Sequence, residues 1–342
     1  MGHNGHMLLG VDIGFGDVKA TVFYDGKQTT IKFPTAISPC QRSEIRGLDN
    51  TQDQFIYKSR KFLLSYDALF SDTIISTRSL QFLKEFTPIF LFKVLVELSK
   101  ELNIPLERLV HQPKKICLGL PLEFFFLEKN AIRGSIETFM VTYILKGKST
   151  SYTVSCPNVD VRAQGQGVMT DFLITEKGLR TGHLESNVLV VDIGFNTVDV
   201  LSFIRGRASS NGSYMMNGQG VCRITRELGI EIKQEQGVTL SEQKLKEVLR
   251  TRQLKIKNQD LPLNSTIDMV VTEYVAHLIH ELETKSQQTM NDAETLIVAG
   301  GGAYYLSGQL KSLFTDNFLH IPGQPEFANA RGYMKKLKVV DS

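Results

Sequence analysis

One stretch of the sequence occurs twice: LLGVDIGFGDVKA at residues 8–20 and VLVVDIGFNTVDV at residues 188–200. Aligned without a gap, the two copies share seven of their thirteen residues at an offset of 180 positions, with Asp12 against Asp192. A second apolar run follows each copy and closes with a Gly-containing turn. A repeat of this kind predicts two halves, each opening with a buried strand, a tight turn and a second strand.

Each copy places an Asp at the end of its buried strand and a Gly two positions later, Gly14 or Gly194. A buried carboxylate is costly unless it is paired, hydrated or close to a metal ion. A Gly permits a turn with positive φ and a close approach by a ligand. Because a Gly-rich turn presents backbone N–H groups to an anion, most naturally phosphate, the two turns together predict a clamp on a polyphosphate. The two Asp side chains would hold Mg²⁺ through water.

The alternative for each copy is an ordinary hairpin with an Asx turn. A single short glycine motif would favour that alternative, because such motifs match by chance often. Two nearly identical copies favour a shared ligand.

Size and composition indicate a globular protein of two domains. The chain has 342 residues, of which 42% are hydrophobic and 22% charged, which suits two domains of ordinary size. The net charge of +3 argues against a protein that wraps nucleic acid directly. The four cysteines are far apart and form no CxxC pair, as is typical of reduced thiols in a cytoplasmic protein.

No segment reads as a secretory signal or a membrane span. Residues 1–6 are polar, and we expect a disordered leader or a cloning remnant before Met7. The most apolar stretch, Pro88–Leu102, carries four charged residues and is too short to span a bilayer. It predicts a packed helix with Thr87 as its N-cap and Pro88 as its first residue.

Three further glycine-rich stretches open helices. Residues 163–167, AQGQG, suit a site where backbone and amide groups face a phosphate or a water, although a plain loop-to-helix junction fits equally well. Residues 217–220, NGQG, suit either a ribose or phosphate contact or a simple cap. The strand 295–299 runs into three glycines and then a helix from Ala303, which is a nucleotide-contact signature in an α/β protein.

These motifs resemble those of a known family. DIGFGDVKA at 12–20, DIGFNTVDV at 192–200 and VAGGGAYYL at 298–306 are similar to the two phosphate motifs and the adenosine motif of the actin superfamily, in order and in spacing. Within it, the chain looks most like the ParM/StbA plasmid-segregation proteins and archaeal actin-like proteins, whose endings are similar to FANARGY at 327–333.

The resemblance implies an α/β, actin-like ATPase fold in which two RNase-H-like domains, related by the internal repeat, surround a nucleotide cleft. Domain I would comprise residues 1–162 plus 326–342, and domain II residues 163–325. The ligands would be ATP or GTP with Mg²⁺, and no feature of the sequence decides between the two nucleotides.

The resemblance also assigns roles to residues. The catalytic set would be Asp12 and Asp192, which hold the hydrated Mg²⁺ and polarise water, and Gln164, which positions the attacking water. Lys19 would reach the β and γ phosphates as a point charge. The other nucleotide contacts would come from the first turn (Gly14, Phe15, Gly16, Asp17), the second turn (Gly194, Phe195, Asn196, Thr197) and the ribose and base region (Gly218, Gly220, Gly300, Gly301, Gly302, Tyr304).

Two phenylalanines depart from the family pattern. Phe15 and Phe195 stand where actins often have a serine, so the phosphate contact there must come from the backbone. Gln164 orients a water but is not a strong base. We therefore expect slow hydrolysis that depends on positioning and on Mg²⁺ electrostatics.

The function that the resemblance implies is a filament-forming ATPase that segregates plasmid DNA from within the cytoplasm. Head-to-tail contacts that do not close a ring give open filaments, and hydrolysis would destabilise the polymer. A centromere-binding adaptor of the ParR type would link filament and plasmid, so that DNA is contacted only indirectly and no membrane is involved.

Two alternatives use the same fold. A non-polymerising small-molecule kinase needs an Asp or Glu base near the γ-phosphate, and Gln164 at that position argues against it. A membrane-associated scaffold would need an anchor. The tail Lys335–Val340 is basic and partly apolar, but one short tail of this kind anchors poorly.

Overall fold

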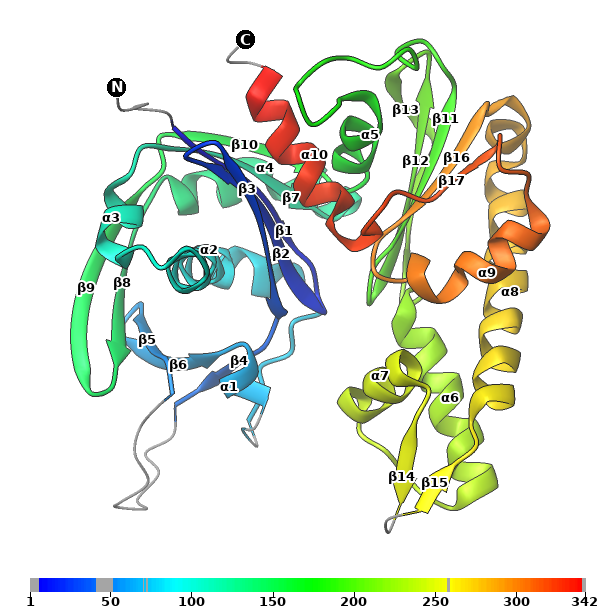
Figure 1. Ribbon diagram of the computed structural model, residues 1–342, viewed down its shortest axis with the longest axis horizontal. Coiled ribbons are helices and arrows are strands. Elements are labelled where there is room, and N and C mark those ends of the chain that lie inside the picture. The colour runs from blue at the N-terminus through cyan, green and yellow to red at the C-terminus, as the bar shows by residue number, and fades with distance from the viewer. Residues whose placement is uncertain (1–5, 41–51, 70, 72, 257–258, 340–342) are drawn as a thin grey trace. The chain divides into compact units, whose positions relative to one another are not determined.

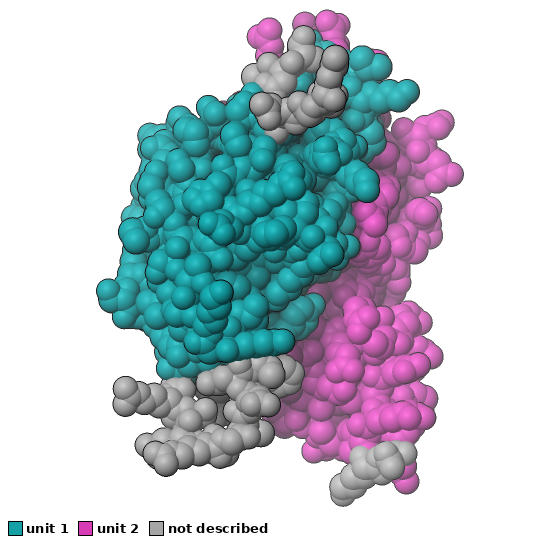
Figure 2. Space-filling view, turned by 60° about the vertical axis from the view of Figure 1, so that its left-hand side comes forward, with its two compact units in different colours: residues 1–181, 327–342 teal, residues 182–326 magenta. Residues whose placement is uncertain are grey.

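The computed structural model describes residues 6–40, 52–69, 71, 73–256 and 259–339. The chain forms two compact units, coloured separately in Figure 2. Unit 1 comprises residues 1–181 and 327–342, and unit 2 comprises residues 182–326. The predicted leader lies, except for His6, outside the described residues.

The first repeat copy lies in the inner sheet of unit 1. This five-stranded sheet has the order β10-β7-β1-β2-β3. Three strands form an antiparallel meander: β1 (Met7–Ile13), β2 (Asp17–Tyr24) and β3 (Lys27–Pro34). Two more join parallel to β1, namely β7 (Lys114–Leu120) and β10 (Asn158–Ala163). β1 is buried along its whole length, as its run of apolar residues predicts.

A second five-stranded sheet completes unit 1, in the order β4-β6-β5-β8-β9. Its strands are β4 (Ile37–Pro39), β5 (Gln54–Tyr57), β6 (Arg60–Leu64), β8 (Thr138–Leu145) and β9 (Lys148–Ser155). The long helix α2 (Leu80–Leu102) runs between the two sheets (Figure 1) and joins both in one hydrophobic core. Three more helices belong to this part of unit 1: α1 (Tyr66–Leu69), α3 (Leu106–His111) and α4 (Leu122–Glu137).

The predicted start of α2 was wrong. The helix begins at Leu80, with the hydroxyl of Ser79 accepting the N–H of Phe82 as the N-cap, and Pro88 lies inside it. A proline in a helix interior removes a hydrogen bond and costs about 3 kcal/mol. The additional turns bury Phe82 and Phe86, and each buried aromatic side chain contributes about 1.5–3 kcal/mol, which offsets that cost.

Unit 2 contains the second repeat copy in a sheet of order β13-β12-β11-β16-β17. Its strands are β11 (Val188–Ile193), β12 (Thr197–Ile204), β13 (Arg207–Asn217), β16 (Thr295–Ala299) and β17 (Leu319–His320). Four helices and a small hairpin accompany it: α6 (Val221–Gln236), α7 (Glu242–Thr251), α8 (Asn264–Asp292), α9 (Ala303–Leu313), β14 (Leu254–Ile256) and β15 (Gln259–Leu261).

The two inner sheets have the same topology and the same register. Each has a three-stranded antiparallel meander, and two parallel strands follow one another on the free side of its first strand. Asp12 pairs with Lys19 across β1 and β2, and Asp192 pairs with Asp199 across β11 and β12. The sequence repeat is therefore a structural repeat, which confirms the predicted α/β fold.

The last helix packs into unit 1. Helix α10 (Ala328–Val339), preceded by the 3₁₀ turn η1 (Pro325–Phe327), lies against β1, β7 and α5 (Gln166–Leu173) (Figure 1). These contacts place residues 163–181 in unit 1, whereas the predicted domain boundary assigns them to domain II. The boundary of the compact units lies at residues 181 and 182.

Among the described residues, no helix is long and apolar enough to cross a membrane.

Candidate functional site

The first glycine turn joins β1 to β2, and hydrogen bonds from other segments of unit 1 hold it. The Gly14 N–H donates to the Asp17 carbonyl at 3.2 Å, which closes the turn. Its carbonyls accept hydrogen bonds from other segments. The Thr35 hydroxyl donates to the Gly14 carbonyl at 2.6 Å, and the Thr35 N–H donates to the Gly16 carbonyl at 3.0 Å. The Thr77 hydroxyl donates to the Phe15 carbonyl at 2.9 Å. Because its carbonyls are held, the conformation of the turn is fixed, as a backbone site for an anion requires. The ring of Phe15 is buried and packs edge-on against Phe124.

Asp12 lies at the end of β1 and is 5% exposed. Its carboxylate accepts a hydrogen bond from Gln164 Nε2 at 2.6 Å, and Lys19 Nζ lies 3.9 Å away. Burial raises the pKa of Asp12, because its effect exceeds the opposing effects of the Lys19 charge and the Gln164 hydrogen bond. A cation near this carboxylate would stabilise its ionised form. The structure thus brings three of the predicted residues together in unit 1.

The second glycine turn, between β11 and β12, closes in the same way, with the Gly194 N–H donating to the Thr197 carbonyl at 2.9 Å. Its carbonyls are held by the first amides of α6: Gly194 by Val221 (3.1 Å), Phe195 by Cys222 (2.8 Å) and Asn196 by Gly220 (3.3 Å). Both turns therefore have three fixed carbonyls, although side chains and a strand end hold the first and a helix start holds the second.

Gly220 is required by this packing. A Cβ at this position would lie 2.5 Å from the Gly194 carbonyl oxygen and 2.6 Å from that of Phe195. The N–H of Gly220 is itself used within the protein. A Cβ at Gly218, where φ is +69°, would meet no atom within 4 Å. The ribose contacts at these two residues stay predictions.

The two units differ in the charged residues that are paired at the end of the first two strands, which in unit 2 are Asp192 and Asp199. They are 6% and 1% exposed and face each other across the strand pair, where like charges destabilise a sheet. The Thr197 hydroxyl donates to Asp199 at 3.1 Å. In unit 1, the position opposite Asp12 is Lys19. A divalent cation would relieve the repulsion in unit 2, so these hard oxygen donors fit Mg²⁺.

The three glycines after β16 pass against the end of β11. Gly300 has φ of +82°, and a Cβ there would lie 2.5 Å from Asp192 Oδ1. The Gly302 N–H donates to the Ile193 carbonyl at 2.9 Å. A Cβ at Gly301 would meet no atom within 4 Å. The first and third glycines are thus needed for packing, and the middle one leaves open surface. Tyr304, in the first turn of α9, is 51% exposed.

The predicted residues therefore fall into two groups. Unit 1 holds Asp12, Gly14, Phe15, Gly16, Asp17, Lys19 and Gln164, and unit 2 holds Asp192, Gly194–Thr197, Gly218, Gly220, Gly300–Gly302 and Tyr304. In the described part of the chain, no cluster of three or more His, Cys, Asp or Glu forms a metal site on its own. Mg²⁺ bound with a nucleotide commonly takes only one or two carboxylates from the protein.

Sequence analysis did not predict the residues that hold the first turn and the Gln164 loop. Thr35 and Thr77 are 21 and 62 residues from the carbonyls that they contact. Asn329 and Tyr333 contact the Gln164 loop from 160 or more residues away. Only the similarity of FANARGY to family endings pointed to that segment, and it indicated no role.

Fold and turns together define the class of protein: an actin-like fold whose two inner sheets each carry a glycine turn and an aspartate at the same place. Residues 10–167 match the family model "Actin like proteins N terminal domain", and residues 190–312 match "Archaeal actin homologue MreB-like, C-terminal". The two halves of the chain are thus similar to two family models of actin-like proteins.

Solved structures show the same fold. The archaeal actin homologue Ta0583 is 20% identical with a TM-score of 0.75, over 97% of this chain and 99% of that one, and has also been solved with ADP. A ParM from a 15-stranded filament of Clostridium botulinum is 21% identical with a TM-score of 0.74, over 98% and 99%. The ParM of Bacillus thuringiensis with AMPPNP is 13% identical with a TM-score of 0.74, over 98% and 99%. A comparison with curated proteins gives no match.

Proposed function

We propose that this protein is a cytoplasmic ATPase that assembles into filaments with Mg²⁺-nucleotide bound and segregates plasmid DNA through a ParR-type adaptor. The observation that carries the proposal is the pair of glycine turns, each with fixed carbonyls and a buried aspartate before it. Structural neighbours support nucleotide binding and self-assembly, since one is a ParM filament and others hold ADP or AMPPNP. GTP stays an open alternative to ATP.

In this proposal, backbone N–H groups of the two turns bind phosphate oxygens, and Lys19 adds a point charge. Asp12 and Asp192 would hold Mg²⁺ through water. When bound, Mg²⁺ would neutralise phosphate charge and polarise the attacking water. The turns are rigid before the ligand arrives, so little energy is spent on reorganising them.

Gln164 orients the attacking water. Its Nε2 donates to Asp12, which fixes the amide and leaves Oε1 as the atom that accepts a proton of the water in a hydrogen bond. An amide does not remove that proton at neutral pH, so its contribution is positioning. Hydrolysis is accordingly slow, and subunits have time to assemble before phosphate is released.

The two alternative functions have less support. The kinase needs a carboxylate where this chain has Gln164. The membrane scaffold needs a free tail, but Lys335 and Leu337 are 5% and 8% exposed. Lys335 pairs with Asp171, and Leu337 packs with Leu8 and Cys117. Side chains buried in this way are not available to a bilayer.

The site is tested by phosphate release with Mg²⁺-ATP. Asp192→Ala should abolish release, whereas Asp260→Ala, on an exposed hairpin, should keep the wild-type rate. Gln164→Ala should slow release about tenfold or more and leave the affinity for a fluorescent ATP analogue within about twofold. Wild-type turnover in Asp192→Ala would contradict the site, and loss of binding in Gln164→Ala would contradict its role with water.

A further inference from the structure

The backbone on both sides of Gln164 is fastened by side chains of the C-terminal helix. Gln164 lies in the two-residue link between β10 and α5. Before it, the Ala163 carbonyl accepts a hydrogen bond from the Tyr333 hydroxyl at 3.0 Å. After it, the Gly165 N–H donates to Asn329 Oδ1 at 2.9 Å. All five residues are buried or nearly so.

Asn329 also replaces the missing N-cap of α5. Helix α5 has Gly165 at its N-cap, which has no side chain to accept an N–H. The Val168 N–H donates instead to Asn329 Oδ1 at 3.3 Å. The side-chain oxygen of Asn329 thus accepts hydrogen bonds from two N–H groups at the start of α5. Asn329 is 3% exposed. Two orphan donors of a helix start are satisfied from a distant segment.

Close backbone contact holds α10 in place. A Cβ at Gly10 or at Gly332 would overlap the carbonyl oxygens of Ala330 and Gly167, respectively. A Cβ at Gly119 would lie 2.5 Å from the Tyr333 hydroxyl oxygen. The absence of side chains at these glycines lets α10 lie directly on β1, β7 and α5, so that the short side chain of Asn329 reaches the loop.

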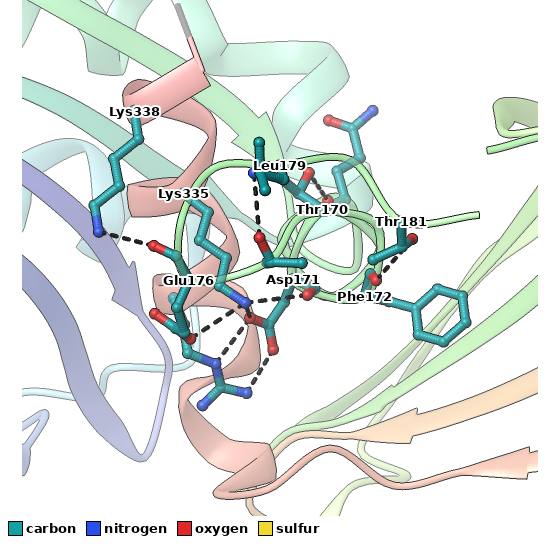
Figure 3. A network of polar contacts seen from close by, with 11 residues as sticks. Thr170, Asp171, Phe172, Glu176, Leu179, Thr181, Lys335 and Lys338 are labelled. Carbon is teal, nitrogen blue, oxygen red and sulfur yellow. Dashed lines mark hydrogen bonds and ion pairs between the residues drawn. The ribbon is translucent and has the colours of Figure 1, made fainter. Parts of the chain in front are cut away.

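Ion pairs anchor the two helices further along. Lys335 Nζ lies 2.7 Å from the carboxylate of Asp171 and 3.3 Å from that of Glu176. Figure 3 shows these contacts, and Arg331 also pairs with Asp171. The side chains of Lys335 and Asp171 are both 6% exposed, so the pair between them is little screened by solvent. These ion pairs tie α10 to α5 and the residues after it, beyond the loop that carries Gln164.

We propose that Asn329 and Tyr333 are positioning residues for hydrolysis: they hold the backbone of Gln164 so that its amide presents Oε1 to the water. The proposal rests on the proposed role of Gln164. Neither side chain contacts nucleotide; each acts through the loop. An error of about 1 Å in such a placement can cost about a hundredfold in rate.

The expected effect falls on turnover and not on binding. Asn329→Ala should lower the rate of phosphate release about tenfold or more, with the affinity for nucleotide within about twofold of wild type. Asn329→Asp keeps the accepting oxygen and should retain most of the rate. Tyr333→Phe removes only the hydroxyl, so it keeps the packing of α10 and should slow release even if Asn329→Ala fails to fold. Leu337→Ala, which loosens α10 away from the loop, is the control and should keep the rate.

The deciding measurement is a double-mutant cycle between positions 164 and 329. If Asn329 acts through Gln164, then Gln164→Ala/Asn329→Ala releases phosphate as fast as Gln164→Ala alone. Additive losses, or equal losses in Leu337→Ala, would mean that α10 contributes only stability and would overturn the inference. A normal rate in Gln164→Ala would overturn the proposed function instead. Slow Gln164→Ala with normal Asn329→Ala and Tyr333→Phe would overturn the inference alone.

Discussion

Asp12 is the single residue in which the opposing demands of folding and binding are clearest. Burial raises the pKa of its carboxyl above the usual value of 3.8, despite Lys19 and the Gln164 hydrogen bond. A carboxyl whose pKa is raised in the folded state adds stability below its unfolded pKa, and this contribution is lost as the pH rises through the folded pKa. Above that raised pKa, the ionised Asp12 therefore opposes folding of the nucleotide-free protein.

Asp12→Asn should therefore raise the Tm of the nucleotide-free protein at pH 7.5. Each 1 kcal/mol added to the free energy of unfolding raises the Tm by about 2–4 °C for a unit of this size. The advantage over wild type should shrink as the pH falls toward and below the raised pKa. Differential scanning calorimetry between about pH 7.5 and pH 4 measures this difference in Tm. Adding Mg²⁺-ATP should reverse the order, because only wild type gains stability from the ligand. An advantage that is independent of pH would contradict the account of Asp12.

Among the secondary-structure elements, the start of α6 is the one that the second turn depends on most. Gly220→Ala places a methyl group against two carbonyl oxygens that no side chain rotation can move. We expect a loss of stability of about 1–3 kcal/mol together with loss of nucleotide binding. Thermal unfolding and titration with a fluorescent nucleotide measure the two effects.

Gly301→Ala is the matched control from the other glycine stretch. A Cβ there meets nothing within 4 Å, so the Tm should stay within about 2 °C of wild type. If Gly301 contacts the base as predicted, nucleotide affinity should nevertheless fall. A normal affinity would remove Gly301 from the site, and a wild-type Tm in Gly220→Ala would contradict the packing of the second turn.

The elements differ in how far their sequence predicted them. The meander strands and the repeat were predictable, because buried runs and turn glycines are local signals. The start of α2 was not, since Pro88 resembles a helix start and only the buried Phe82 and Phe86 reveal the earlier turns. The pairing of β5 with β8 in the second sheet of unit 1 was not predictable either, because the two strands lie some 90 residues apart in the chain.

The residues of the candidate site also differ in whether the sequence predicted them. The aspartates, the glycine turns and Gln164 were found from the repeat and the resemblance. The threonines that fix the first turn, and Asn329 and Tyr333 beside Gln164, were not. Each acts through one or two hydrogen bonds to the backbone of a distant segment, and no spacing in the sequence encodes such a contact.

For the whole molecule, fold and assembly are separate questions. Proteins of this fold can be filament subunits, as the Clostridium botulinum ParM shows. Identity near 20% carries the fold but no surface, so the contacts between subunits have to be tested directly. The slow hydrolysis that Gln164 implies is what would give a filament its limited lifetime.

The most direct test is right-angle light scattering of the purified protein after addition of Mg²⁺ with ATP, and separately with GTP, while phosphate release is followed in the same sample. The account predicts that scattering rises before phosphate appears and then decays as it accumulates, with a slower decay in Gln164→Ala. Phosphate release without any rise in scattering, at protein concentrations well above micromolar, would contradict a filament and favour the small-molecule kinase.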